Sequence, residues 1–336
     1  MTDRFPLLRL PQDALKSVLR SMELLDLILF SFSSDRAKSL VASINMKSKV
    51  IAVVSDFFKL IVHVDRQQFQ FQFYYHEVKN GVIPIKMGHP GIVYLAHFMN
   101  GEGKRYRVPK VMDIPSWFSH IKAIFNCSKI SQLQFFRDVG NFDLDSIRDC
   151  MIQEDIHELV AATENSDEYN RKIMKTFRSM KYLYLSNETY RNGKPSGEVL
   201  IQNFSRFFIG ADSIAPTTMK LDDILMMNSK YVVINFSKLT EKDANQLLKL
   251  WMRGNLKLER YALSFANGMN VDRVTVLKGI KFQEIPLKVK RFHEASEDPI
   301  EGGIDVIRKD GTRGTIKFWN GYMHFFVWHD YCIMNN

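Results

Sequence analysis

The stretch Gly101-Glu102-Gly103-Lys104-Arg105 has the glycines and basic residues of a phosphate-binding loop. A P-loop needs four residues between its first glycine and the Gly-Lys pair, followed by Ser or Thr, because backbone N–H groups and this hydroxyl contact the phosphates and Mg²⁺. The stretch has neither that gap nor the hydroxyl residue. We therefore expect a turn here and no nucleotide-binding site.

Two pairs of histidines and one pair of carboxylates are the other groups that could bind a metal or transfer a proton. His89 and His97, like His324 and His329, lack the i, i+4 spacing and the acidic companion of zinc-binding motifs. Asp222-Asp223 is typical of the first turn of a helix, where the dipole favours carboxylates. We expect no catalytic residue, no metal and no cofactor, and hence a non-catalytic protein.

The composition of the 336-residue chain indicates a globular protein, because 46% of its residues are apolar and 25 are phenylalanine. Its three cysteines, Cys127, Cys150 and Cys332, are far apart and form no CxxC pair, which predicts a reducing environment without disulfides. Neither a signal peptide nor an apolar run of about 18 residues is present. We therefore expect an intracellular protein of the cytoplasm or nucleus, with no membrane partner.

The net charge of +9 is compatible with binding to nucleic acid or to other anions. Basic residues gather between Lys278 and Arg291, but Glu284 and Glu294 interrupt them, and no nucleic-acid-binding motif accompanies them. We interpret the charge as a solvated surface and do not expect nucleic acid as a partner.

Residues 5–44 contain three short helical patterns, each with an apolar side, in a segment too small to fold alone. Pro11 suits the first position of a helix, and apolar residues then recur at helical spacing from Leu15 to Met22. A second helix is predicted over 24–30, and Ser34 is a suitable N-cap for a third. Such a segment is typical of a docking module.

This segment resembles an F-box. The resemblance rests on Leu10-Pro11, on Leu15, Val18 and Leu19 beyond this pair, and on Asp26-Leu27-Ile28 and Ser34-Asp35-Arg36. It is closest to the nematode form of the motif, in which Arg36-Ala37-Lys38 stands where many F-boxes carry an arginine and a tryptophan. The resemblance implies that an F-box at residues 1–46 binds a Skp-type adaptor and, through it, the cullin of an SCF-type cullin-RING ubiquitin ligase. The adaptor-binding residues that it implies are Leu10, Pro11, Leu15, Val18, Leu19, Leu27 and Ile28.

Residues 47–116 are predicted to form antiparallel strands followed by a loop-rich connection. Period-two alternation predicts strands over 50–54, 58–64 and 69–75. Glycine and proline are frequent over 80–115, so we expect an extended and loop-rich connection there.

From Trp117 onward, helical stretches alternate with short apolar strands. The predicted strands are 130–136, 181–186, 206–211, 230–236 and 259–265. The last four recur about every 25 to 29 residues, which predicts a leucine-rich-repeat-like solenoid of parallel strands with helices on one side. The first interval is about twice that period, as if one strand were missing.

The clearest helix of this region begins at Thr240, which forms a capping box with Asp243, and ends at Gly254. Together with residues 221–230, it resembles the F-box-associated domain that follows the F-box in expanded nematode families. The resemblance implies that residues 117–336 bind the protein substrate.

Three further strands are predicted near the C-terminus, over 304–308, 315–319 and 322–328, joined by hairpin turns at Asp310-Gly311 and Asn320-Gly321. We expect them to cap the solenoid. The whole chain is thus predicted to be a mixed α+β or α/β protein, with a small helical F-box and a strand-helix solenoid.

The predicted function is substrate recognition for an SCF-type ligase, in which the chain holds a target beside the ubiquitin-conjugating enzyme without a catalytic group of its own. Strand alternation turns one row of residues away from the helices. The expected substrate-binding residues are Phe136, Tyr182, Tyr184, Phe208, Val233, Asn235 and Arg260. The alternative is a basic solenoid that binds nucleic acid or anionic ligands independently of a ligase.

Overall fold

The structure is a computed structural model, and the chain divides into two compact units, Met1–His157 (unit 1) and Glu158–Asn336 (unit 2). The residues it describes are 7–75, 84–99, 102–110, 112–136, 142–154, 156–163, 167–186, 189–190, 192–210, 217–235, 237–265, 271–294, 296 and 298–330. The protein is of the mixed α and β class, as predicted. The three predicted domain ranges stay a prediction.

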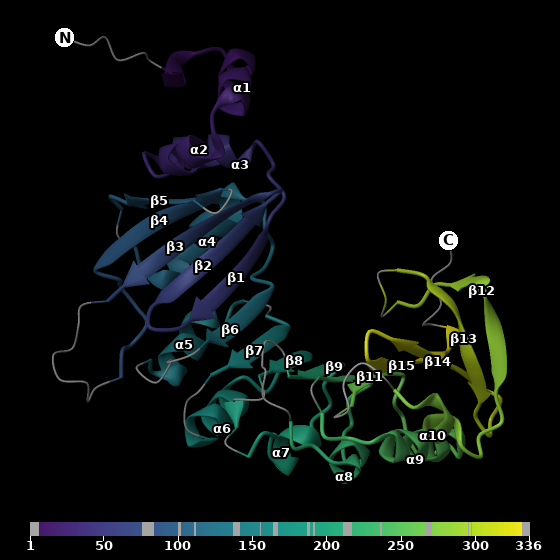
Figure 1. Cartoon of the computed structure of the whole chain (residues 1–336). Coiled ribbons are helices and arrows are strands. Elements are labelled where there is room, and N and C mark those ends of the chain that lie inside the picture. The colour runs from purple at the N-terminus through teal and green to yellow at the C-terminus, as the bar shows by residue number, and fades with distance from the viewer. Residues whose placement is uncertain are drawn as a thin grey trace. The chain divides into compact units, whose positions relative to one another are not determined.

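Unit 1 begins with four short helices and continues as a sheet with two further helices (Figure 1). The helices are η1 (Leu7–Arg9), α1 (Gln12–Ser21), α2 (Leu24–Ser31), α3 (Asp35–Ala42), α4 (Ile114–Ile124) and α5 (Leu144–Met151). The strands are β1 (Lys49–Val54), β2 (Phe58–Val64), β3 (Gln67–Tyr74), β4 (Ile92–Met99), β5 (Glu102–Arg107) and β6 (Gln132–Phe136). Their order is β6-β1-β2-β3-β4-β5, parallel between β6 and β1 and antiparallel elsewhere.

Helix α4 covers one face of this sheet. Asp113 begins the helix by accepting a hydrogen bond from the Ser116 N–H at 2.8 Å. The fully buried Trp117 ring then packs edge-on against Phe73, at 5.4 Å between ring centroids, and against Phe71 at 5.8 Å. These phenylalanines alternate with glutamines along β3, so the predicted strand with one buried face is confirmed.

The extended, loop-rich connection predicted over 80–115 contains more regular structure than expected, because β4, β5 and the start of α4 lie there. Gly88, Pro90 and Gly91 stand just before β4, and Pro109 follows β5, so most of these residues mark strand ends. Alternation within β4 does bury Val93 and Leu95. The predicted turn at Gly101 is wrong over residues 102–105, which belong to β5, while Gly101 itself lies outside the described residues.

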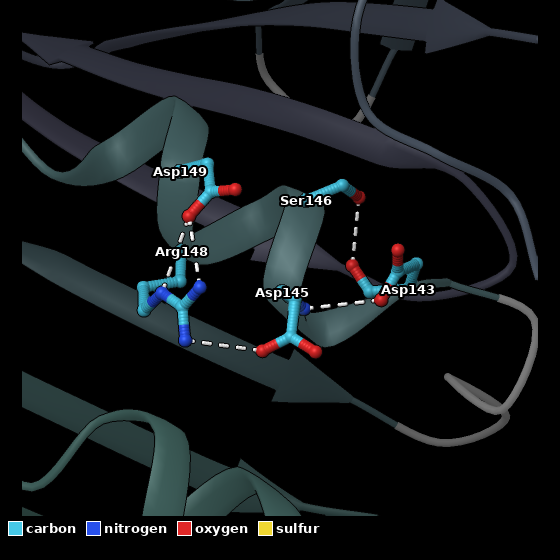
Figure 2. A network of polar contacts seen from close by, with 5 residues as sticks. All are labelled: Asp143, Asp145, Ser146, Arg148 and Asp149. Carbon is cyan, nitrogen blue, oxygen red and sulfur yellow. Dashed lines mark hydrogen bonds and ion pairs between the residues drawn. The ribbon is translucent and has the colours of Figure 1, made fainter.

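Helix α5 begins with a compact set of local polar contacts (Figure 2). The Asp143 carboxylate accepts from the Asp145 N–H at 3.1 Å, and the Ser146 hydroxyl donates to the Asp143 carbonyl at 2.7 Å. Further along, Arg148 forms ion pairs with Asp145 at 3.1 Å and with Asp149 at 3.0 Å. Because these groups are exposed and pair with one another, they stabilise the helix start and do not form a ligand site.

Unit 2 is a strand-helix alternation followed by antiparallel hairpins. Its helices are α6 (Asp167–Thr176), α7 (Gly197–Leu200), α8 (Leu221–Leu225), α9 (Glu241–Met252) and α10 (Arg273–Leu277). Its strands are β7 (Glu158–Ala162), β8 (Tyr182–Leu185), β9 (Arg206–Ile209), β10 (Tyr231–Ile234), β11 (Arg260–Ser264), β12 (Gln283–Arg291), β13 (Ile300–Ile307), β14 (Arg313–Trp319) and β15 (Tyr322–Trp328). The strand order is β7-β8-β9-β10-β11-β15-β14-β13-β12.

Strands β7 to β11 are parallel, and α6 to α9 line one side of them (Figure 1). Strand alternation predicts that the residues between those of the outward row are buried. Those of β8 to β11 are almost fully buried: Leu183, Leu185, Phe207, Ile209, Val232, Ile234, Tyr261 and Leu263. The capping box of α9 is also confirmed, because the Thr240 N–H donates to Asp243 at 2.8 Å and the Asp243 N–H donates back to the Thr240 hydroxyl at 3.3 Å.

Besides β4 and β5 of unit 1, unit 2 contains two strands, β7 and β12, that the sequence did not predict. Strand β7 fills the gap in the predicted spacing, and its short stretch with two alanines gave only a weak alternation signal. Strand β12 is exposed on both faces and contains Pro286, so it shows no alternation at all. Strand β13 begins four residues earlier than predicted, because Gly302 and Gly303 belong to it with positive φ angles. The predicted hairpin turns at Gly311 and Asn320-Gly321 are confirmed.

Candidate functional site

The three N-terminal helices have clear start signals. The backbone of α1 begins at Gln12, so Pro11 occupies the N-cap and not the predicted first helical position. The Ser34 hydroxyl accepts a hydrogen bond from the Ala37 N–H at 3.1 Å, which confirms the predicted N-cap of α3. The start positions of these helices are therefore determined by the local sequence and do not require a partner protein.

Burial divides the seven residues expected to bind the adaptor into two sets. Leu15, Leu19, Leu27 and Ile28 are buried within the chain, with 4% exposure or less. Pro11 is exposed, and Leu10 and Val18 are half-buried. The apolar stripe on α1 thus belongs mainly to the interior of the helical segment, and only its margin is accessible.

The helical segment is anchored to unit 1 through the end of α2. The Phe32 ring stacks on the His120 ring at 4.4 Å between centroids and packs against Trp117 at 5.2 Å. The Ser31 hydroxyl oxygen lies 2.9 Å from His120 Nε2. Burial, with smaller contributions from Lys38 and Lys110, lowers the pKa of His120 to about 4, so the imidazole is neutral. This buried Ser-His pair is a structural contact.

A second candidate surface is the face of the unit 2 sheet opposite its helices, which we call the aromatic face. We define it by two rows of directly paired residues. The first row is Tyr182, Arg206, Tyr231, Arg260 and Phe326, and the second is Tyr184, Phe208, Val233, Ala262 and His324. The structure thus brings together five of the seven residues expected to bind substrate.

The other two expected residues lie elsewhere. Asn235 follows β10 and donates to the Gly210 carbonyl at 3.4 Å, next to the end of the second row. Phe136 ends β6 in unit 1, where its side chain is 39% exposed. Phe136 therefore belongs to a different unit and is not assigned to the aromatic face.

Stacking holds the side chains of the aromatic face in place. The Arg206 guanidinium lies 5.1 Å from the Tyr182 ring centroid and 5.8 Å from that of Tyr231. The Arg260 guanidinium lies 5.2 Å from the Phe326 ring. In the second row, the rings of Tyr184 and Phe208 stack at 4.5 Å. Burial lowers the pKa of Arg260 and raises that of Tyr184.

At one end of the aromatic face lies a cavity of about 490 Å³. Arg260, Phe326 and His324 from the face line it, and Lys317 and the 64%-exposed Trp319 add to its walls. Burial, together with the nearby charges of Arg260 and Lys317, lowers the pKa of His324 to about 4, so its imidazole is neutral. The cavity thus combines flat apolar rings with cations, as protein-recognition surfaces do.

Part of the aromatic face is covered by the segment that follows β12. The Tyr231 hydroxyl donates a hydrogen bond to the Glu294 carboxylate. The His293 ring packs edge-on against Phe326 and Trp328 at 5.5 and 5.3 Å, and its Nε2 lies 3.1 Å from the Val327 carbonyl oxygen. Tyr231 is consequently 8% exposed, whereas Tyr182, Tyr184 and Phe208 are half-buried.

Sequence reasoning missed Arg206, Tyr231, His324 and Phe326. The first two obey the same strand alternation as their neighbours, so a stricter application would have included them. The last two join the face only because β15 pairs with β11, a contact between segments far apart in the chain. No local pattern predicts such a pairing.

The groups considered for catalysis do not converge. His97 stacks on Phe69 at 4.5 Å, and Asp223 pairs with Lys194 at 2.8 Å, so each has a structural neighbour. Within the described ranges, no three or more His, Cys, Asp or Glu side chains are grouped so as to hold a metal ion. Cys127 and Cys150 are free thiols, and Cys332 lies outside the described residues. No described helix is long and apolar enough to cross a membrane.

Comparison with protein families identifies two domains. A model of the F-box domain matches residues 7–49, and a model described as F-box associated matches residues 197–262. The chain matches no curated protein and no solved structure. It is therefore a protein with an N-terminal F-box followed by an F-box-associated domain, the predicted layout. Such domains are typically non-catalytic recognition modules, and the pair supports a role as a substrate adaptor of SCF-type ubiquitin ligases.

Proposed function

We propose that this protein is the substrate-recognition subunit of an SCF-type ubiquitin ligase, bound to a Skp-type adaptor through its F-box and to a target protein through unit 2. The observation that carries the proposal is the presence of both domains in one chain, the second of which contributes β9 and β10 and part of β11 to the aromatic face. As a subunit of such a ligase, the protein would be located inside the cell.

In this proposal the adaptor contacts the margin of the apolar stripe. Leu10, Pro11 and Val18 are accessible and would touch the adaptor directly. Leu15, Leu19, Leu27 and Ile28 would act through the shape of the helical segment, because they are buried inside it. An interface centred on half-buried apolar residues gains most of its affinity from their desolvation.

The proposed substrate surface is the aromatic face with its cavity. Tyrosine, phenylalanine and arginine are common anchors of protein interfaces because they bury large areas at little cost in conformational freedom. The cavity volume of about 490 Å³ is suited to one or two side chains of a target segment. The parallel run from β7 to β11, with a helix after each of its first four strands, supports the leucine-rich-repeat-like arrangement that the spacing predicts.

The chemistry of this function needs no catalytic group in the chain. A receptor that holds a target beside a charged ubiquitin-conjugating enzyme raises the effective concentration of the acceptor lysine. The geometry required is an accessible surface for each partner, which the F-box margin and the aromatic face provide.

Co-purification tests the proposal. The full chain, expressed together with a Skp-type adaptor, should elute with it as a one-to-one complex at physiological salt. Affinity purification after proteasome inhibition should then recover ubiquitinated proteins with the chain. A chain that elutes alone at micromolar concentration, while well folded by circular dichroism, would refute the adaptor assignment.

A further inference from the structure

The helical side of unit 2 contains a second large cavity, of about 680 Å³, between α6 and α7. Three basic side chains line it: Arg171, Lys175 and Arg178. The buried side chains of Met174 and Val199 form apolar parts of its wall, and Glu198 is the one carboxylate in the lining. None of these residues belongs to the aromatic face.

The sequence of α6 explains why the three cations share one side. Arg171, Lys175 and Arg178 follow one another at i, i+4 and i+7, so they lie along a single stripe, which Arg178 continues two residues beyond the helix end. The opposite stripe contains Ile173 and Phe177, which are buried against the sheet side of the unit. The helix is thus amphipathic, and its basic stripe lines the cavity.

The basic side chains that line this cavity outnumber the acidic ones. Some other basic side chains of unit 2 do have carboxylate partners, such as Lys230 with Glu259 at 2.8 Å and Arg291 with Asp305 at 3.0 Å. Arg171, Lys175 and Arg178 form no ion pair with any residue in the described part of the chain. With Glu198 as the single acid, the lining carries a net charge of about +2.

We propose that the cavity between α6 and α7 is a binding site for a phosphate monoester. A phosphate monoester carries a charge of about −1.5 to −2 at neutral pH, which matches the charge of the lining. Two guanidinium groups bind phosphate oxygens with paired N–H donors, and the amides of Gln202 and Asn203 add further donors at the wall. The apolar surface of Met174 and Val199 contacts the group that carries the phosphate.

This site is independent of the proposed ligase function. It uses the helical side of unit 2, and it requires neither the adaptor nor the aromatic face. A phosphate carried by a peptide would make it a docking site for phosphorylated proteins, whereas a free small phosphate would make it a ligand site. The phosphate chemistry is the same in both cases, and the experiment separates them.

The test uses the immobilised full chain and two peptide libraries. Each library has seven-residue peptides with degenerate flanks, one with a central phosphoserine and the other with serine. We expect at least tenfold greater retention of the phosphorylated library, and at least tenfold loss of that retention in the double variant Arg171→Ala and Arg178→Ala. Displacement by millimolar inorganic phosphate or AMP measures the affinity for small phosphates.

The matched control is Lys172→Ala, which removes one charge from an exposed position of the same helix that does not line the cavity. It should retain the phosphorylated library like wild type. Binding of AMP that is lost in the double variant, without retention of phosphopeptides, would keep the site and assign it to small ligands. Equal retention of both libraries with no binding of AMP or phosphate would overturn the proposal. So would a loss of phosphopeptide retention in Lys172→Ala as large as the loss in the double variant. Adaptor binding should be unchanged in every variant, so failure here leaves the ligase proposal standing.

Discussion

The F-box helices and the aromatic face of unit 2 use apolar residues in opposite ways. In the F-box, four apolar residues of the motif are interior: Leu15, Leu19, Leu27 and Ile28 are at most 4% exposed. On the aromatic face, Tyr182, Tyr184 and Phe208 stay half-buried, on the side of the sheet opposite the buried Leu183 and Phe207. The buried apolar residues of a sequence motif can therefore form the core of a domain, while the residues that contact a partner lie at accessible positions between them.

The difference also has a physical cause in the two secondary structures. An α-helix in a small segment must bury its whole stripe against its neighbours to be stable, because isolated helices of this length are marginal. A sheet covered by helices on one face already has its core there, so the other face is free to carry aromatic side chains.

The largest expected effect on stability comes from removing a buried side chain from the F-box core. Leu19→Ala should lower the free energy of unfolding by about 2–5 kcal/mol, because Leu19 is fully buried and its removal leaves a cavity. Urea denaturation, followed by hydrogen exchange of the α1 to α3 amides, measures it. Val18→Ala is the matched control, and its smaller burial should limit the loss to about 1 kcal/mol. Equal losses would show that the division into core and margin is wrong.

The next largest expected effect is a fall in the free energy of unfolding at acidic pH, caused by protonation of His120, which packs against the end of α2. The pKa of His120 is about 4 in the native chain and about 6.5 when unfolded, so the unfolded state binds the proton more strongly. Stability should therefore be complete above pH 6.5 and fall as the pH decreases from 6.5 to 4. At pH 5 the expected loss from this group is about 2 kcal/mol.

Comparison with His120→Gln isolates this contribution, because other histidines also titrate. Glutamine retains a partner for the Ser31 hydroxyl but has no charge to gain. The stability difference between pH 7.5 and pH 5 should be about 2 kcal/mol smaller in the variant, measured by urea unfolding with hydrogen exchange of the α4 amides. An identical pH dependence in both proteins would show that His120 is not neutral in the native state.

Substitutions on the aromatic face should have the smallest effect on stability but a large effect on substrate binding. Tyr184→Ala with Phe208→Ala removes a stacked pair from half-buried positions, which should cost about 1–2 kcal/mol in stability. Adaptor binding should persist, while the set of proteins recovered after proteasome inhibition should shrink. A substitution on the other face, such as Leu183→Ala at a fully buried position, should instead cost about 2–5 kcal/mol in stability. A variant interactome identical to that of wild type would exclude this face as the substrate surface.

Local signals predicted the elements of this fold well. The capping box at Thr240 located α9, and period-two alternation located β8 to β11 together with the side on which Phe207 and Val232 are buried. Strand β12 escaped prediction because it is exposed on both faces and therefore shows no alternation. Glycines at strand ends and within β13 hid the extent of β4, β5 and β13.

The candidate sites were predictable only in part. Alternation found Tyr184 and Arg260 because the strand itself sets their direction. The cavity beside Arg260 needs β15 next to β11 and the segment from Ser296 to Glu301, and these contacts join distant parts of the chain. Likewise, helical spacing shows that Leu15 and Leu19 share a stripe, but it does not show whether a partner or the chain itself covers it.

The most direct test of the central claim is adaptor capture by two variants of neighbouring residues in α1. Val18→Asp places a charge at the accessible margin of the stripe, and Ser17→Asp places the same charge at an exposed position beside it. We predict that wild type and Ser17→Asp bind a Skp-type adaptor equally. Val18→Asp should bind at least about 100-fold more weakly while remaining folded under the assay conditions, because a desolvated charge is costly in an apolar interface. Capture of the adaptor by folded Val18→Asp with wild-type affinity would contradict the assignment of this surface.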